Sequence, residues 1–256
     1  MRLTNTNYFS TEANKEYFSA SQFKAFQTCE ASALAQIRGE WEQEMTDALL
    51  QGSYVDAHFS GTLDQFLAEH PEILNKRTGE LKAAYVSARA AIERAERDPM
   101  FMEYMNGSKQ VVMTGELFGE KWKCKIDVLH DDKIVDLKYM RDMNTVYKHG
   151  ERKTFVAAYQ YDLQGYIYQE IVRQNTGKRL PFYLAVITKE NPADIRIIHI
   201  PDEILNSYAG LVEHYTLRYS LVKAGDLEPD RCEHCAYCRE TRVLTGAMEY
   251  ENLVED

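Results

Sequence analysis

Residues Lys125–Lys138 read KIDVLHDDKIVDLK and contain two short apolar runs separated by a polar tetrapeptide. The aliphatic and β-branched residues of each run are typical of strands, and the tetrapeptide HDDK has the composition of a hairpin turn. We therefore expect the two runs to pair antiparallel. Because side chains alternate between the faces of a strand, Asp136 and Lys138 should share one face, and pairing should bring Asp127 close to Asp136.

Two carboxylates and an ammonium group at one spot stabilise a fold poorly, because like charges repel and an uncompensated buried ion costs on the order of several kcal/mol. A divalent cation removes that penalty, and oxygen ligands suit Mg²⁺ or Mn²⁺. Asp127, Asp136 and the carbonyl of Leu137 would hold the ion, which polarises a phosphodiester and lowers the pKa of a bound water. Lys138 would orient this water or help to deprotonate it. The plainer interpretation of the segment is a solvated hairpin with incidental charges.

The order Asp127, eight residues, then Asp136, Leu137 and Lys138 resembles the active-site motif of the PD-(D/E)xK nuclease superfamily. The resemblance implies an α/β fold with a restriction-endonuclease-like core, in which a mixed sheet with an antiparallel meander is flanked by helices. It also implies that hydrolysis of phosphodiester bonds depends on Mg²⁺ or Mn²⁺.

Two further motifs agree with this resemblance. RecB-like and RecE-like nucleases carry a histidine in a G-x-x-x-H type context on an N-terminal helix, and the segment Gly52–His58 lies in the equivalent place. The resemblance implies that His58 is a metal ligand. These nucleases also carry a Q-xxx-Y motif after the lysine strand, which Gln164 and Tyr168 match, so Gln164 would contact the metal site or the DNA backbone. The plainer alternatives are an ordinary surface or core histidine and an aromatic helix face that packs on the sheet.

The wider pattern resembles phage and prophage RecE-like exonucleases of the exodeoxyribonuclease VIII type over nearly the whole chain. It includes the stretches SASQFKAFQTCEASAL, GELFGEKWKCKID and RCEHCAYCR. The resemblance implies an exonuclease that degrades DNA from duplex ends during phage recombination in a bacterial cytoplasm. A single-strand annealing protein and further copies of the chain are its implied partners. One alternative is a nuclease that acts on single-stranded or flapped DNA, as in CRISPR adaptation. The others are a catalytically silent module that binds DNA ends and a protein-interaction module that a metal ion bound by the cysteines stabilises.

The cysteines form the second informative pattern. Residues Cys232–Cys238 read CEHCAYC, which places three thiols close enough together for one soft-metal centre. A fourth ligand is needed, and Cys29, about 200 residues upstream, and His234 are the two candidates. Free reduced cysteines are the plainer interpretation, and Cys124, alone in an expected strand, should be a small buried hydrophobe.

Some RecB-like relatives, including the AddB nuclease and CRISPR-adaptation nucleases, join one N-terminal cysteine to three C-terminal ones around an iron–sulfur cluster. By this resemblance a 4Fe–4S cluster is held by Cys29, Cys232, Cys235 and Cys238. Zinc is the alternative occupant. In either case, the centre would tie the two chain ends together.

Composition limits the remaining possibilities. With 256 residues, 45% hydrophobic and 27% charged, the chain can bury a full core, and we expect one domain over residues 1–256 with an N-terminal helical elaboration and a Cys-rich C-terminal segment. The net charge of −10 argues against coating of nucleic acid by bulk attraction, so cations near the site must attract the phosphates. The sequence has no apolar stretch of membrane-spanning length, no signal peptide and no disulfide-rich spacing, so we expect no membrane partner and a cytoplasmic location.

Periodicity and breaker residues predict the order of elements. Helices are expected from Ser19 to near Gly39 and over 47–69, 79–97, 152–174 and 201–223. Strands are expected over 109–118, 121–129, 133–138, 181–188 and 195–200. This alternation is compatible with the fold that the resemblance implies, although propensity alone leaves the order of strands in the sheet open.

Overall fold

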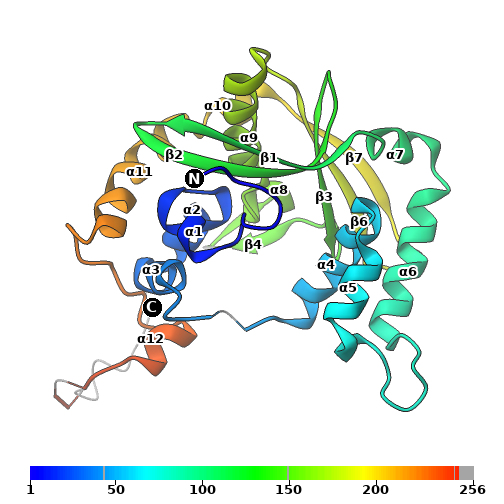
Figure 1. Cartoon of the computed structure of the whole chain (residues 1–256), viewed down its shortest axis with the longest axis horizontal. Coiled ribbons are helices and arrows are strands. Elements are labelled where there is room, and N and C mark those ends of the chain that lie inside the picture. The colour runs from blue at the N-terminus through cyan, green and yellow to red at the C-terminus, as the bar shows by residue number, and fades with distance from the viewer. Residues whose placement is uncertain (43, 149, 245, 248–256) are drawn as a thin grey trace.

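A computed structural model of the protein describes residues 1–42, 44–148, 150–244 and 246–247, and it is built around a five-stranded mixed sheet (Figure 1). The strand order is β1-β2-β3-β6-β7. Strands β1, β2 and β3 form an antiparallel meander, β6 runs parallel to β3, and β7 returns antiparallel to β6. The bounds are β1 Ser108–Leu117, β2 Glu120–Leu129, β3 Ile134–Met140, β6 Phe182–Thr188 and β7 Ile195–Ile200.

The sheet separates two hydrophobic cores, as alternation along β3 shows. Ile134 packs in the core formed with helices from both ends of the chain, whereas Val135 and Leu137 pack in the core on the other face. The first core includes residues of α2 (Ala20–Thr28), α3 (Glu30–Arg38), α9 (Tyr161–Thr176) and α11 (Ala209–Ala224). The second includes residues of α4 (Asp47–Ser60), α5 (Leu63–Glu69), α6 (Ala83–Glu96) and α7 (Pro99–Tyr104). Figure 1 shows α2, α3 and α11 on one side of the molecule and α4, α5, α6 and α7 on the other.

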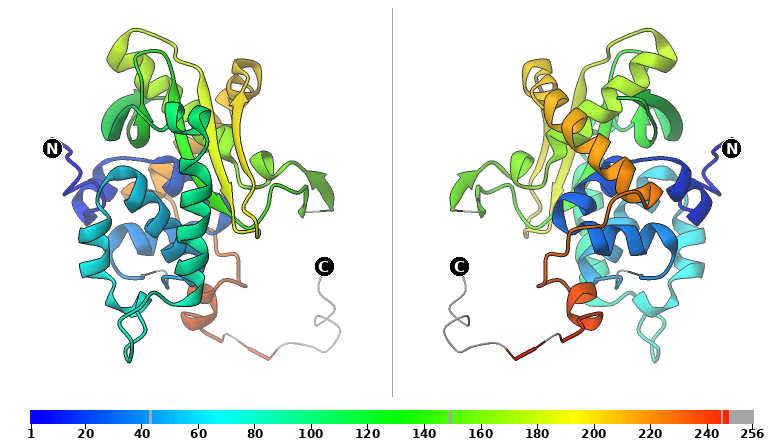
Figure 2. Two further views of the ribbon diagram at one scale, coloured as in Figure 1. Left: turned by 90° about the vertical axis from the view of Figure 1, so that its right-hand side faces the viewer. Right: turned by 90° about the vertical axis from the view of Figure 1, so that its left-hand side faces the viewer.

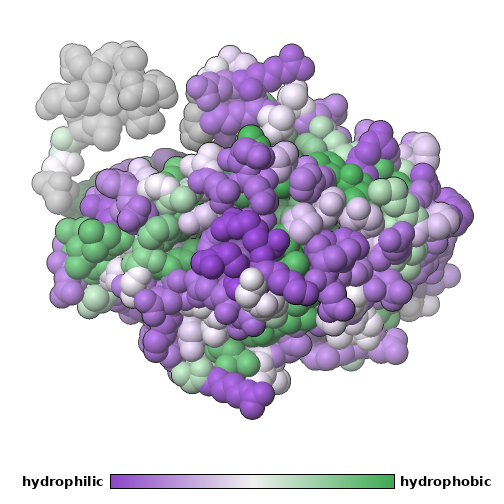
Figure 3. All heavy atoms as spheres, turned by 90° about the horizontal axis from the view of Figure 1, so that it is seen from above, coloured by the Kyte–Doolittle hydropathy of each residue, from purple (hydrophilic) through white to green (hydrophobic). Residues whose placement is uncertain are grey.

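Short elements complete the chain. They are α1 (Thr11–Glu16), the 3₁₀ helix η1 (Pro71–Ile73), β4 (Val146–Lys148), β5 (Glu151–Lys153), α8 (Phe155–Ala158), α10 (Asp202–Asn206) and α12 (Ala236–Glu240). Strands β4 and β5 pair as a separate hairpin, which stands out from the body in Figure 2. On the face seen in Figure 3, hydrophilic residues dominate and hydrophobic ones form small scattered groups. In the part of the chain that the structure describes, no helix combines the length and apolarity needed to cross a bilayer.

The five predicted strands lie within two residues of the observed ones, but four of the expected helices are divided, including the one expected over 201–223, which forms α10 and α11. The helix expected from Ser19 stops at Thr28 and resumes at Glu30, because Cys29 is extended with φ −165° and ψ 110°. The helix expected over 47–69 ends at Gly61, whose φ of +77° favours glycine. The helix expected from 152 begins later, because residues up to Lys153 belong to the hairpin. Breaks of this kind depend on tertiary contacts that periodicity does not report.

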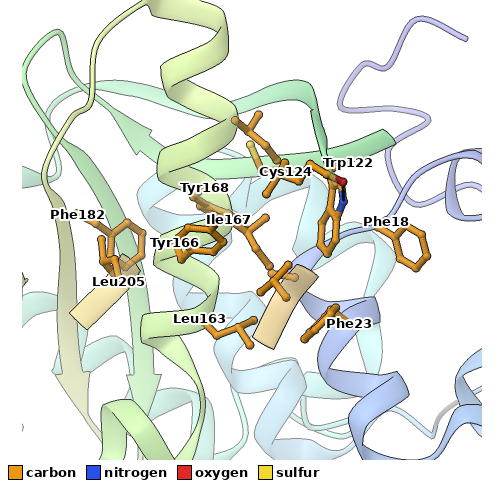
Figure 4. Packing of buried hydrophobic residues seen from close by; sticks show 14 of the residues in the cluster. Phe18, Phe23, Trp122, Cys124, Leu163, Tyr166, Ile167, Tyr168, Phe182 and Leu205 are labelled. Atoms are coloured by element: carbon orange, nitrogen blue, oxygen red, sulfur yellow. Dashed lines mark hydrogen bonds between the residues drawn. The ribbon is translucent and has the colours of Figure 1, made fainter. Parts of the chain in front are cut away.

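Helix α9 packs closely on the sheet because Gly165 lacks a side chain. A Cβ at this position would lie 2.6 Å from Phe182 Cδ1 and 2.9 Å from Leu205 Cδ2. Phe182 and Leu205 lie together beside α9, next to Tyr166 (Figure 4). A glycine weakens a helix interior by about 1 kcal/mol relative to alanine, so packing must outweigh propensity at this position.

We predict that Gly165→Ala lowers the free energy of unfolding, because overpacking costs about 1–3 kcal/mol and exceeds the gain in helix propensity. Gly210→Ala, in α11 with no atom within 4 Å of the added Cβ, is the matched control and should be neutral or stabilising. Urea unfolding of both variants measures the difference. Equal stabilisation by the two substitutions would show that the contact with Phe182 does not limit the approach of α9.

Candidate active site and cysteine centre

The site begins where β2 and β3 separate. These strands pair through Val128 opposite Val135 and Leu129 opposite Ile134, and no further partners follow in the register. Where the next pair would bring Asp127 opposite Asp136, the carboxylate Oδ2 of Asp127 instead accepts a hydrogen bond of 2.8 Å from the N–H of Leu137. The side chain of Asp127 thus takes the place of a backbone carbonyl, and it lies in the opening between the two strands.

Asp136 is 2% exposed, and its two oxygens have different neighbours. Its Oδ1 accepts a hydrogen bond of 2.6 Å from Gln164 Nε2, and its Oδ2 lies 2.6 Å from Lys138 Nζ. Beyond this ion pair, Oδ2 is a buried oxygen with no hydrogen bond among the described residues. The structure therefore brings together Asp127, Asp136, Lys138 and Gln164, as the sequence motifs predict.

A third carboxylate, which the sequence analysis missed, comes from α4. Asp56 is held by a 2.9 Å hydrogen bond from Gln110 Nε2 to its Oδ1, and burial followed by the charge of Asp136 raises its pKa. The G-x-x-x spacing counted from Gly52 leads to position 56, so a strict count could have found this residue.

His58, the predicted metal ligand, lies elsewhere. Two residues along a helix turn the side chain by about 200°, so His58 does not share the face of Asp56. His58 Nε2 instead lies 2.8 Å from Glu96 Oε1, and its ring packs edge-on against Phe59. On α4, the structure thus places Asp56, and not His58, beside the carboxylates of the strands.

The electrostatics of the site reflect an excess of negative charge. Burial, followed by the charges of Asp136 and Asp56, raises the pKa of Asp127 well above its usual range. Burial alone would lower the pKa of Lys138, but the carboxylates of Asp136 and Asp127 raise it above its ordinary value. Three acids thus lie close together, and Lys138 forms an ion pair with one of them. A divalent cation would offset the repulsion that remains among the carboxylates.

The donor set and its spacing fit a hard cation that keeps part of its water shell. The three aspartates and the carbonyl of Leu137 are all oxygen donors, which suits Mg²⁺ or Mn²⁺. The four cysteines described below have ligand atoms within 4.8 Å of one another. Among the described residues, the oxygens of the three aspartates do not form so close a group. Mg²⁺ commonly binds through one or two carboxylates and several waters, so this open arrangement is compatible with it.

A second lysine also reaches the site and was not predicted. Lys24 of α2 donates to Gln164 Oε1 at 3.3 Å and to the carbonyl of Tyr159 at 3.2 Å. Burial and the nearby charge of Lys138 lower the pKa of Lys24 to about 7. Nothing in the stretch SASQFKAF marks this lysine, because its approach to α9 depends on tertiary packing alone.

Tyr168, the last residue of the Q-xxx-Y motif, is buried beside these groups and contacts backbone. Its hydroxyl donates a hydrogen bond of 3.3 Å to the carbonyl of Lys125 in β2. The ring belongs to the first hydrophobic core, where Figure 4 shows it next to Tyr166 and Ile167. Its contacts join α9 to β2, the strand that carries Asp127.

Four cysteines meet beside α12, which lies far from β1 and β2 in Figure 1. The Sγ atoms of Cys29, Cys232, Cys235 and Cys238 all lie within 4.8 Å of one another. Cys29 is 3.5 Å from Cys238, and Cys232 is 4.0 Å from Cys238, measured between Sγ atoms. Cys29 therefore completes the group, and His234 is not part of it. Cys124 is buried alone in β2, as predicted.

Protein contacts hold the two chain ends in place around the cysteines. Arg218 of α11 forms two hydrogen bonds of 2.5 and 2.8 Å with the carboxylate of Glu30, the residue after Cys29. The same carboxylate accepts the N–H of Asp230 at 2.8 Å, shortly before the cysteine triplet. The break in the helix at Cys29 is thus part of the arrangement that brings residue 29 to the C-terminal segment.

The charges of the thiols suit metal binding. Burial raises the pKa of Cys29 to about 12. Burial acts in the same direction on Cys232, but the N–H groups of His234 and Cys235 outweigh it and lower its pKa to about 6. One thiolate is therefore available near neutral pH, and a bound metal ion would deprotonate the other three.

The sulfur spacing distinguishes between the two predicted occupants. In a tetrahedral zinc site with Zn–S bonds of about 2.3 Å, neighbouring sulfurs lie roughly 3.8 Å apart. The observed separations of 3.5 and 4.0 Å bracket this value. A 4Fe–4S cluster is larger than one ion and requires its four thiolates to be further apart. The geometry favours a single ion such as Zn²⁺.

Comparisons with known proteins agree with this architecture. Residues 19–241 match a family described as "PDDEXK-like domain of unknown function (DUF3799)". A protein from Eubacterium rectale, described as "Putative exonuclease", has a solved structure with a TM-score of 0.96; it is 48% identical and the match covers 99% of this chain and 98% of that chain. The structure of SSO0001 matches with a TM-score of 0.33 and 12% identity over 85% of this chain and 91% of that chain, too weak a likeness to support an argument. No curated protein matches. The family match spans most of the chain and confirms the predicted fold, so this chain belongs to the PDDEXK-like family.

Proposed function

We propose that the chain is a metal-dependent deoxyribonuclease that hydrolyses phosphodiester bonds from the ends of duplex DNA. The observation that carries this proposal is the meeting of Asp56, Asp127 and Asp136 with Lys138 where β2 and β3 separate. The family match supports it, as does the strong likeness to a protein whose description names an exonuclease. A role in phage recombination beside a single-strand annealing protein rests on the sequence resemblance alone.

Each residue has a defined task in this proposal. Asp56, Asp127, Asp136 and the carbonyl of Leu137 would hold Mg²⁺ or Mn²⁺, which when bound would polarise a phosphate oxygen and acidify water. Lys138 keeps its proton at Nζ, because the neighbouring carboxylates raise its pKa, and it orients the attacking water or stabilises developing negative charge.

Gln164 is a positioning residue in the same site. Its Nε2 fixes one oxygen of Asp136, and its Oε1 accepts from Lys24, so the amide is held at both ends. The second oxygen of Asp136 is thereby left to face Lys138 and the ion. Loss of Gln164 would allow Asp136 to turn away from the position that binds metal.

Local positive charge supports DNA as the substrate despite the acidic total. The hairpin of β4 and β5 carries Lys148, Arg152 and Lys153 together with Tyr147, which is 77% exposed. This hairpin follows the lysine strand and stands out from the body (Figure 2). Cations and an exposed aromatic ring on a projecting hairpin suit contact with phosphates and bases.

We predict that Asp136→Asn and Lys138→Ala each lower cleavage of end-labelled linear duplex by at least about 100-fold, because each removes a group that acts on the transition state. Lys133→Ala is the control and should retain activity, because Lys133 lies in the turn between β2 and β3 and pairs with exposed Asp132. Circular and single-stranded DNA assayed alongside would separate an end-dependent enzyme from a flap nuclease. Full activity in either site variant would refute the mechanism, and binding without cleavage by the unaltered protein with Mn²⁺ would favour a silent end-binding module.

The repulsion among the three aspartates should also affect how the stability of the metal-free protein depends on pH. The pKa of Asp127 is raised in the folded protein, so the metal-free native state binds a proton more tightly than the unfolded chain does. Its stability should therefore fall as pH rises from about 4, the unfolded value, through the raised native value. In Asp127→Asn this loss should be smaller, because an amide oxygen still accepts from Leu137 without carrying charge.

Thermal unfolding of both proteins in EDTA across this pH range tests the prediction, and addition of Mn²⁺ should raise the Tm of the wild type more than that of the variant. Identical pH dependence in EDTA and identical Mn²⁺ shifts in Tm would show that the charge of Asp127 does not destabilise the metal-free protein and that Asp127 does not bind the ion.

We further propose that the four cysteines bind one Zn²⁺ that ties the chain ends together. Metal analysis should find about one zinc per chain in colourless protein, and Cys238→Ser should lower both zinc content and Tm. Cys124→Ala, a buried cysteine outside the centre, should leave the zinc content unchanged. A brown protein that contains iron would instead establish the iron–sulfur cluster.

A further inference from the structure

A cavity of about 460 Å³ lies next to Asp56. Its walls come from three parts of the chain: the N-terminal segment with Phe9, helix α4 with Ser53 and Asp56, and the meander with Gln110 and Lys125. This volume is in the range of small-molecule sites and is large enough for one nucleotide unit. Because Asp56 belongs to both, the cavity and the proposed metal site share a wall.

Two phenylalanines line the cavity, Phe66, which is buried, and Phe9, which is exposed and contacts its neighbours. Phe9 is 71% exposed, which is unusual for a phenylalanine and leaves a large apolar surface in solvent. Its ring is braced edge-to-face by Tyr8, with centroids 4.9 Å apart and an interplanar angle of 86°. Lys125 Nζ lies 5.4 Å from the ring centroid. An exposed ring held in this way is suited to stacking.

The charges in the cavity argue against a phosphate as the bound group. Among the lining residues, Lys125 is the one cation, and the carboxylates of Asp56 and Glu69 oppose it. The other polar groups are amides and hydroxyls, such as those of Gln65 and Ser53, which donate and accept hydrogen bonds without charge. A flat heterocycle with donors and acceptors on its edge matches this set of groups better than an anion does.

The backbone of β1 is strained at Gln110, the residue whose side chain holds Asp56 in the wall of the cavity. Gln110 has φ +51°, in the left-handed region that non-glycine residues seldom adopt, and its place in the register is opposite Asp127. Its side chain holds Asp56 with the 2.9 Å hydrogen bond. Strain of this kind, which costs on the order of 1 kcal/mol, tends to be kept where it positions a functional group.

We infer that this cavity binds a nucleobase of the DNA strand next to the scissile phosphate, stacked on Phe9. The inference rests on the proposed nuclease function and adds a binding site to it. The base would enter between the N-terminal segment and α4, while the scissile phosphate would lie beside the cation that Asp56, Asp127 and Asp136 are proposed to hold. An exonuclease that seats a terminal base here would position the scissile bond by stacking and not by recognition of sequence.

The test measures stacking separately from cleavage. The base analogue 2-aminopurine, whose fluorescence is quenched by stacking, is placed at the 5′ or the 3′ terminal nucleotide of a duplex and mixed with the inactive Asp136→Asn chain and Mg²⁺. Quenching is expected for one of the two ends. It should be lost in Phe9→Ala, restored in Phe9→Trp and unchanged in Phe118→Ala, an exposed aromatic at the distant turn between β1 and β2.

Kinetics on the active chain give the second readout. Phe9→Ala should raise KM for duplex ends roughly tenfold with a smaller change in kcat, because stacking binds substrate and transition state alike. An abasic terminal nucleotide should weaken binding by the wild type to the same extent and have no further effect on Phe9→Ala.

The outcomes separate the two proposals. Equal quenching with and without Phe9 overturns the base site even if cleavage is intact, as does equal KM for normal and abasic ends. Quenching that depends on Phe9 in a protein that cleaves no DNA supports the base site and refutes the nuclease function. Absence of both quenching and cleavage refutes both.

Discussion

The whole architecture depends on the early separation of β2 from β3. If the two strands paired along their full length, Asp127 would lie opposite Asp136, and two buried carboxylates would meet with no room for water or metal. Instead, the side chain of Asp127 accepts the N–H of Leu137, so the opening costs no unsatisfied donor at that position. The strand that supplies the lysine remains fixed by β6, which pairs with it from Ile134 to Met140.

The N-terminal part of the chain completes what the meander begins. Helix α4 brings Asp56 from the second core, α2 brings Lys24 from the first, and Phe9 forms one side of the adjoining cavity. These residues precede the strands in the sequence and must be held against them. The ion pair of Glu30 with Arg218 and the cysteine centre tie this region to the C-terminal segment. If the cysteines bind an ion as proposed, it would help to hold the N-terminal helices in place, at a distance from the three aspartates.

The sequence was sufficient for the fold and for the approach of Asp127, Asp136 and Lys138 to one another. Strand alternation predicted that Asp136 and Lys138 share one face. The Q-xxx-Y motif that follows the lysine strand predicted that Gln164 lies near them. His58 lies apart from this group, because helical phase decides which of two nearby residues faces the sheet, and Asp56, four residues after Gly52, is the one that contacts β1. Lys24 and Phe9 could not be predicted, since nothing local marks a lysine or phenylalanine whose role depends on packing between distant segments. The sulfur spacing, which favours zinc over the expected cluster, is likewise a property of the folded chain.

The most direct test of this account is the position of Mn²⁺ in crystals of the protein, located by its anomalous scattering. The account predicts manganese bound by Asp56, Asp127 and Asp136 with the carbonyl of Leu137, where β2 and β3 separate. Manganese bound by His58 and Glu96, or no manganese at the three aspartates at saturating concentration, would contradict it.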